Sequence, residues 1–314
     1  MMKSACIRFK TKVKCKIPYK PEYKEYEDNG FLLLPESYSE NGKPVRLVIS
    51  CHGAGGTVTT DDSQIEHQTM TRYLLLNGYA VMDVGGLPEE FADEFGINIF
   101  QNIGAPFAVD SYVAGYNYCV SNFNLYKEVY VHGGSMGGIS STNLVLSNRI
   151  PVIAQSGFCP VLDTYSEIFL HPWSCGLPKT ALGLIYSLEK DKNGDFIYNE
   201  QKIGRFNPFK NPNTDRYPVS VKLWHSADDP IVSPEITEEF VKKVNVGGGH
   251  AELILLPGGE HEPQDYGEYV ASPLGLTEYK ENGKIENLKI TEAIEGVFRF
   301  ISSFENKSKL KARQ

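Results

Sequence analysis

Serine, flanked by glycines, stands in the segment Gly133-Gly134-Ser135-Met136-Gly137. An apolar run precedes this segment and a helix-forming run follows, so we expect a strand, a tight turn and a helix with Ser135 at the apex. Glycines at 133 and 137 suit such a turn because a Cβ atom on its flanks would collide across it. The serine hydroxyl would project over the sheet edge, where the Met136 amide at the helix start favours a developing oxyanion. The chemistry predicted is nucleophilic attack on a carbonyl carbon.

A second glycine-rich turn, Cys51-His52-Gly53-Ala54-Gly55-Gly56, follows the apolar run at 45–50. Glycines let backbone amides approach a substrate carbonyl closely. We assign the Ala54 amide as the second oxyanion donor beside Met136, and Gly55 as a substrate-contacting residue and a candidate third donor. His52 precedes the nucleophile and lies inside the turn, which favours an orienting role over that of catalytic base.

Serine needs a base and an acid to act at neutral pH. Asp228 and Asp229 follow the predicted strand 219–224, although an Asp-Asp-Pro triplet is also an ordinary turn. His261 follows the last predicted strand, 251–256, and so belongs at the same edge of the sheet. The other histidines are placed less well: His67 in a helix, His132 directly before the turn, His171 in an aromatic-rich insertion, His225 at a strand end and His250 before a strand.

Strand and helix signals alternate along the rest of the chain, as in a mostly parallel sheet covered by helices on both faces. We expect parallel strands at 45–50, 79–84, 128–132, 151–154, 219–224 and 251–256. We expect helices at 65–77, 110–122, 139–146, 234–244 and 291–304. Two N-terminal strands, 6–17 and 31–35, complete this α/β fold as an antiparallel edge. Such folds carry their functional groups at the carboxyl ends of the strands.

Residues from about 158 to 217 interrupt the alternation with aromatic side chains and prolines. We interpret the whole chain, 1–314, as a single domain with a cap inserted there over the carboxyl end of the sheet. The cap would line the substrate pocket with aromatic surface, and we assign Phe158 and Trp173 to substrate binding. The alternative is an irregular excursion with a small core of its own.

These motifs resemble the nucleophile elbow and the His-Gly-x-Gly oxyanion loop of the α/β-hydrolase superfamily, and the resemblance runs from about residue 30 to about 304. Residues 224–232 are similar to the superfamily's Gly-x-x-Asp-x-x-Val acid turn. Asp229 matches by its spacing to Val232; Ser226 or a neighbour replaces the usual glycine, so Asp228 stays an alternative. The order Ser135, Asp229, His261 is that of the superfamily. The resemblance implies a Ser-His-Asp triad that needs neither metal nor cofactor.

The activity implied first is that of a serine esterase, which hydrolyses a carboxylic ester through an acyl-enzyme. The aromatic residues of the cap suggest a small-molecule ester, aryl-linked or carbohydrate-linked. The chain also looks like the catalytic domain of prolyl-oligopeptidase-type peptidases, but the sequence has no extension of propeller length, so we expect the ester. A non-catalytic binding protein on the same fold is the third hypothesis.

The formal net charge of −8 disfavours a nucleic-acid partner, and no apolar run is long enough to cross a membrane. The N-terminus has no apolar segment typical of a secretion signal, so we expect a cytoplasmic protein, with export by another route left open. The oligomeric state is also left open. Most cysteines should be free thiols; Cys159 with Cys175 is the one pair to consider for a disulfide.

Residues 189–200 partly fit a calcium-binding loop. Glu189 stands where that loop usually has aspartate, and the following residues are too rich in proline for the exit helix. We therefore expect a hairpin turn at Asn193-Gly194 instead of a calcium site.

Overall fold

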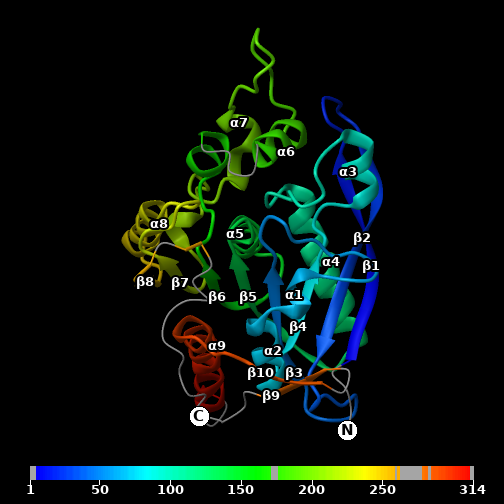
Figure 1. Ribbon diagram of the computed structural model, residues 1–314, viewed down its shortest axis with the longest axis vertical. Coiled ribbons are helices and arrows are strands. Elements are labelled where there is room, and N and C mark those ends of the chain that lie inside the picture. Colours follow the sequence, from blue (N-terminus) through cyan, green and yellow to red (C-terminus); the bar gives the residue numbers. More distant parts are fainter. Residues whose placement is uncertain (1–4, 171–175, 259, 262–277, 282–283, 312–314) are drawn as a thin grey trace.

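The computed structural model describes residues 5–170, 176–258, 260–261, 278–281 and 284–311. Its centre is an 8-stranded sheet in the order β1-β2-β4-β3-β5-β6-β7-β8 (Figure 1). The strands are β1 (Ala5–Lys16), β2 (Tyr23–Leu34), β3 (Val45–Cys51), β4 (Ala80–Val84), β5 (Leu125–Gly134), β6 (Val152–Phe158), β7 (Ser220–Ser226) and β8 (Ala251–Leu256). The pairs from β4 through β8 are parallel, whereas β1 and β2 are antiparallel to their neighbours. The predicted α/β fold with an antiparallel N-terminal edge is confirmed.

Helices pack on both faces of this sheet, and each face has its own apolar core. One core joins the sheet to α4 (Pro106–Asn122), α5 (Gly137–Ser147) and α8 (Pro234–Val246). The other joins it to α2 (Thr69–Leu76) and α9 (Glu292–Lys311). Continuous apolar strands between two cores are what a parallel sheet buried on both faces requires.

Two predictions about the first third of the chain are wrong in detail. The second strand, expected at 31–35, begins earlier, because β2 starts at Tyr23 and pairs with β1 along its whole length. Tyr26 and Asp28 are the buried members of its alternation, and their polarity obscured the pattern. The helix expected at 65–77 is divided into α1 (Gln64–His67) and α2 by Gln68, whose backbone is extended. Helix α3 (Glu89–Phe95) was not predicted.

Segment 158–217 contains short helices and little else that is regular: η1 (Thr164–Leu170), α6 (Leu177–Ile185), α7 (Glu200–Ile203), η2 (Gly204–Phe206) and η3 (Thr214–Arg216). Figure 1 places α6 and α7 beyond the carboxyl ends of the parallel strands. The cap boundaries and the single-domain organisation stay predictions. A hairpin does form at Asn193-Gly194, where Lys190 and Phe196 form an antiparallel bridge.

The last strands are β9 (Glu278–Glu281) and β10 (Lys284–Asn287), which pair with each other in a small separate sheet. Among the described helices, none is both long and apolar enough to span a bilayer. Trp173 and Cys175 lie outside the described residues, as does His171.

Candidate active site

Ser135 occupies the sharp turn between β5 and α5, with a left-handed backbone φ of 52°. Its amide donates to the Phe158 carbonyl at 2.9 Å, which ties the turn to the end of β6. A Cβ atom at Gly133 would lie 2.3 Å from the Gly137 carbonyl oxygen, and one at Gly137 would lie 2.1 Å from that of Cys51. Both distances are far below van der Waals contact, so the crossing of strand and helix requires glycine at both positions.

His261 lies between Ser135 and Asp229 and contacts both of them. Its Nε2 is 2.8 Å from Ser135 Oγ, and its Nδ1 is 2.8 Å from Asp229 Oδ2. Because the carboxylate only accepts, the imidazole donates from Nδ1 and leaves Nε2 to accept the serine proton. Asp228 is exposed and, within the described part of the chain, makes no hydrogen bond to His261. The geometry favours Asp229 over Asp228, and the catalytic roles stay predictions.

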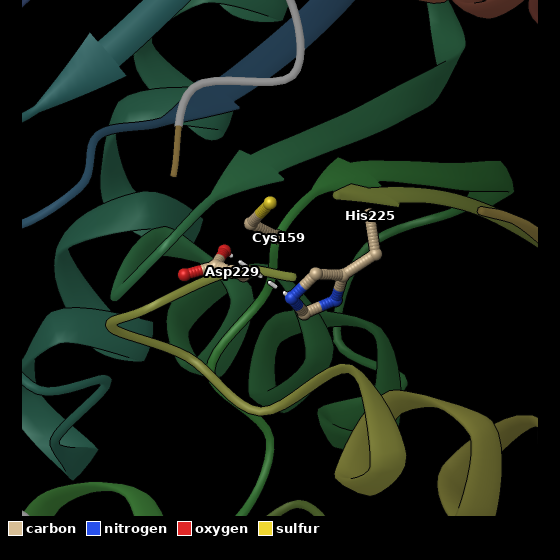
Figure 2. A group of neighbouring side chains, drawn as sticks. All are labelled: Cys159, His225 and Asp229. Carbon is tan, nitrogen blue, oxygen red and sulfur yellow. Dashed lines mark ion pairs between the residues drawn. The ribbon is translucent and has the colours of Figure 1, made fainter. Parts of the chain in front are cut away.

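The Asp229 carboxylate is inaccessible to solvent and surrounded by donors. The amides of Ile231 and Val232 donate to its Oδ1 at 2.8 and 3.0 Å. His225 Nε2 lies 3.3 Å from its Oδ2, and the Cys159 thiol lies close to both groups, within 4.8 Å (Figure 2). Burial alone would raise the pKa of Asp229, but these hydrogen bonds outweigh it and hold that pKa well below its usual range. Asp229 is therefore ionised beside His261.

Two further contacts hold the His225 ring in place. Its Nδ1 lies 3.0 Å from Thr237 Oγ1, and its Nε2 lies 3.1 Å from the Val232 carbonyl oxygen. Two acceptors, Val232 O and the Asp229 carboxylate, face Nε2, so the hydrogen must be on that nitrogen. Sequence reasoning missed this contact and considered Cys159 only for a disulfide. The available signal was that both residues stand at the carboxyl ends of neighbouring strands.

The Ser135 hydroxyl and His261 open onto a cavity of about 510 Å³. Ala54 and Phe158 line this cavity, whereas Gly55 and Met136 are not among its lining residues in the described chain. Neither the Ala54 nor the Met136 amide donates to a protein acceptor in the described residues. Unpaired amides next to a nucleophile are suited to hold an oxyanion.

The loop that carries Ala54 is held by the buried ring of His52. His52 Nδ1 donates to Asp83 Oδ2 at 2.9 Å, and the Asn102 amide donates to His52 Nε2 at 3.0 Å. Tyr112 donates to the other oxygen of Asp83 at 2.8 Å. With both ring nitrogens engaged, His52 orients the loop and has no free nitrogen for proton transfer.

The walls of the cavity differ from the expected aromatic cap. They come mainly from α1, α2 and the strand ends, with His132 at the base. Burial lowers the pKa of His132 to about 4, so this ring is neutral at neutral pH. Phe158 is the sole member of segment 158–217 that lines the cavity in the described chain. Tyr165 and Phe169 instead pack against Tyr198, with ring centroids 4.7 and 5.2 Å from it.

Solved structures with the same architecture are known. A puromycin hydrolase is 16% identical, with a TM-score of 0.57 over 80% of this chain. An acylaminoacyl peptidase from Pyrococcus horikoshii is 15% identical, with a TM-score of 0.58 over 83% of this chain. A puromycin-hydrolyzing peptidase from Mycobacterium tuberculosis is 17% identical, with a TM-score of 0.58 over 75% of this chain.

This chain spans 36%, 38% and 34% of the lengths of those three proteins, so it corresponds to about a third of each. No protein-family model and no curated protein sequence matches the chain. These structural neighbours have the α/β-hydrolase fold. Together with the sheet order and the turn at Ser135, the likeness shows that this chain has the α/β-hydrolase fold.

Proposed function

We propose that this protein is a serine hydrolase that cleaves carboxylic acyl derivatives, with Ser135 as nucleophile, His261 as base and Asp229 as acid. The observation that carries the proposal is the continuous hydrogen-bonded chain from the Ser135 hydroxyl through His261 to the buried Asp229 carboxylate. The serine end of this hydrogen-bonded series faces a cavity large enough for a small organic substrate.

The reaction follows from these contacts. His261 Nε2 takes the proton as Ser135 Oγ attacks the carbonyl carbon, and Asp229 stabilises the resulting imidazolium. The Ala54 and Met136 amides hold the negative oxygen of the tetrahedral intermediate. His261 then gives its proton to the leaving group, which departs and leaves an acyl-enzyme on Ser135. Water, deprotonated by His261, attacks the carbonyl carbon of this ester. The imidazolium then returns that proton to Ser135 Oγ as the acid departs, which restores the serine and the neutral histidine.

A carboxylic ester is the first candidate substrate. An alkoxide is a better leaving group than an amide anion, so an ester depends less than an amide on the proton that His261 gives to the departing group. An amide is the second candidate, and the names of the structural neighbours favour it: these are peptidases and a puromycin hydrolase. The same acyl-enzyme mechanism serves both bonds.

Substrate assays separate the candidates. We expect turnover of p-nitrophenyl acetate or butyrate and covalent labelling by a fluorophosphonate, both reduced by roughly 10³-fold or more in Ser135→Ala. Turnover of Gly-Pro p-nitroanilide or puromycin at a higher kcat/KM than the esters would select the amide. A folded wild-type protein that neither labels nor turns over any of these substrates would contradict the proposal.

A further inference from the structure

A second cavity, of about 520 Å³, lies between the turn that joins β1 to β2 and the start of α4. The end of α6 and the residues after it complete the lining. It shares no lining residue with the cavity at Ser135. Its lining includes Lys14, Lys16, Tyr19, Lys20, Phe107 and Tyr186.

Positive charge accumulates in this cavity because the pairing of charges along β1 stops at its edge. Lys10 and Lys12, outside the cavity, each lie 3.2 Å from a glutamate of β2. Lys14, Lys16 and Lys20, which line it, have no carboxylate within ion-pair distance in the described residues. These lysines come from one short stretch of chain, so their charges reinforce one another.

Asp110 is the one acidic residue among the described residues that line the cavity, and it forms an ion pair with Arg149. The remaining cation, Lys202, donates to the Ser187 carbonyl at 2.6 Å. The cavity therefore has an excess of positive charge, although the protein as a whole is acidic with a formal net charge of −8. A local field opposite to the overall charge favours a bound anion.

Aromatic rings form the other part of the lining, contributed by Tyr19, Tyr23, Phe107, Tyr186 and Phe206. The Tyr186 hydroxyl is buried away from the open cavity, so this residue contributes its ring to the wall and not its hydroxyl. The flat part of a ligand would stack on such rings.

The wall is held in place by contacts between segments distant in sequence. Tyr19 has a left-handed φ of 60°, an unfavourable conformation for a bulky residue. Its amide donates to Ser187 Oγ at 2.7 Å, and its hydroxyl donates to the Leu188 carbonyl at 3.0 Å. These bonds fix the hairpin turn against the residues after α6, so the cavity is formed before any ligand arrives.

We propose that this cavity is a binding site for a small aromatic molecule that carries more than one negative charge. Its volume lies within the range of small-molecule sites, roughly 300–1,000 Å³. Lys14, Lys16 and Lys20 would neutralise carboxylate or phosphate groups, and the aromatic rings would contact the flat body of the ligand. The site is independent of the hydrolytic reaction, because none of its residues belongs to the candidate active site.

Isothermal titration of the full chain with matched probes tests this site. We expect trimesate, an aromatic tricarboxylate, to bind more tightly than its cyclohexane analogue, which has the same charge without the ring. We likewise expect phenyl phosphate to bind more tightly than inorganic phosphate, which has no ring. Binding of trimesate assigns a carboxylate ligand, and binding of phenyl phosphate assigns a phosphate ligand. Failure of both aromatic probes to bind would overturn the proposal.

Variants on the same face of the same strand give the control. Lys14→Gln with Lys16→Gln should weaken binding by about tenfold or more, because each lysine loses a charge-assisted contact. Lys10→Gln with Lys12→Gln removes the same charge outside the cavity and should leave the Kd within about twofold of the wild type. Equal weakening by the two pairs would show non-specific charge attraction and refute the site. Ser135→Ala should bind the probe as the wild type does.

Discussion

At the scale of single residues, the acid of the candidate triad is the most constrained group. Asp229 receives hydrogen bonds from its own turn and from His261, while His225 of β7 faces it and Cys159 lies nearby. The carboxylate cannot rotate without losing several of these contacts at once. Its orientation toward His261 is therefore set by the fold before any substrate binds, as a base-orienting acid requires.

Replacement of this acid by an amide is the sharpest test at this scale. Asp229→Asn can still accept from the Ile231 and Val232 amides, but its NH₂ group would face His261 and favour the wrong imidazole tautomer. We expect kcat to fall by roughly 10³ to 10⁴-fold with the fold retained. Asp228→Asn, one residue away and exposed, should retain most activity. The reverse ranking in steady-state kinetics would assign Asp228 as the acid.

The backbone of Ser135 gives a second prediction. Its φ of 52° is unfavourable for any residue that has a Cβ atom. Ser135→Gly should therefore be more stable than Ser135→Ala by about 1 kcal/mol, although both lack the serine hydroxyl. Urea unfolding of the two inactive variants measures the difference. Greater stability of the alanine variant would mean that the turn is not strained.

At the scale of elements, the site depends on how closely α5 crosses β5 and β3. Gly137 allows the helix to begin directly against the Cys51 carbonyl, and Gly133 allows the strand to pass beneath the first turn. This contact places the Met136 amide and the Ser135 hydroxyl on the same side of the sheet as Ala54. A wider crossing would separate the proposed oxyanion donors, since these come from different strands.

Alanine at Gly137 should be strongly destabilising for this reason. The new Cβ atom would lie 2.1 Å from a backbone oxygen that cannot move without distorting β3. We expect a loss of at least about 3 kcal/mol in the free energy of unfolding, or failure to fold. Gly134→Ala is the control, because its Cβ would meet its nearest neighbour at an ordinary 3.7 Å. Denaturant unfolding that gave equal stabilities would contradict the crossing geometry.

Elements with regular apolar patterns could be predicted from the sequence, and those with polar inward residues could not. Strands β3 to β8 are mostly apolar, with isolated buried polar residues such as Asp83 and Gln155, and their order with the helices was enough to indicate the fold. The first half of β2 was missed because its inward side chains include Asp28. The triad could be proposed from motif order. The approach of His225 and Cys159 to Asp229 could not be predicted, because contacts between the ends of neighbouring strands leave no pattern in either segment alone.

At the scale of the whole molecule, a buried carboxyl near the site couples folding to pH. Burial raises the pKa of Glu167 from 4.5 to about 8, although the amides of Leu162 and Asp163 each donate to it at 2.7 Å. Between these two pKa values the folded state holds a proton that the unfolded state has lost. The contribution to stability is therefore complete below pH 4.5 and is lost as the pH rises through about 8.

Glu167→Gln should remove this dependence, because glutamine keeps an acceptor for the two amides and has no charge to bury. We expect the Tm of the wild type to fall relative to that of the variant between about pH 4.5 and about pH 8, and the gap to stay constant above that range. The two proteins should be closest in stability at the acid end of this range. Differential scanning calorimetry at a series of pH values measures the gap. A gap that did not widen with pH would show that Glu167 is ionised in the folded protein throughout.

The left-handed turn at residue 135 does not depend on the side chain at that position. Its conformation is imposed by the glycines at 133 and 137 and by backbone bonds to Phe158 and Val161, none of which involves the serine side chain. A thiol or a carboxylate introduced at this position would thus be delivered to the same point in space. Redesign of the protein toward other covalent chemistries can begin from that single position, with the rest of the scaffold left as it is.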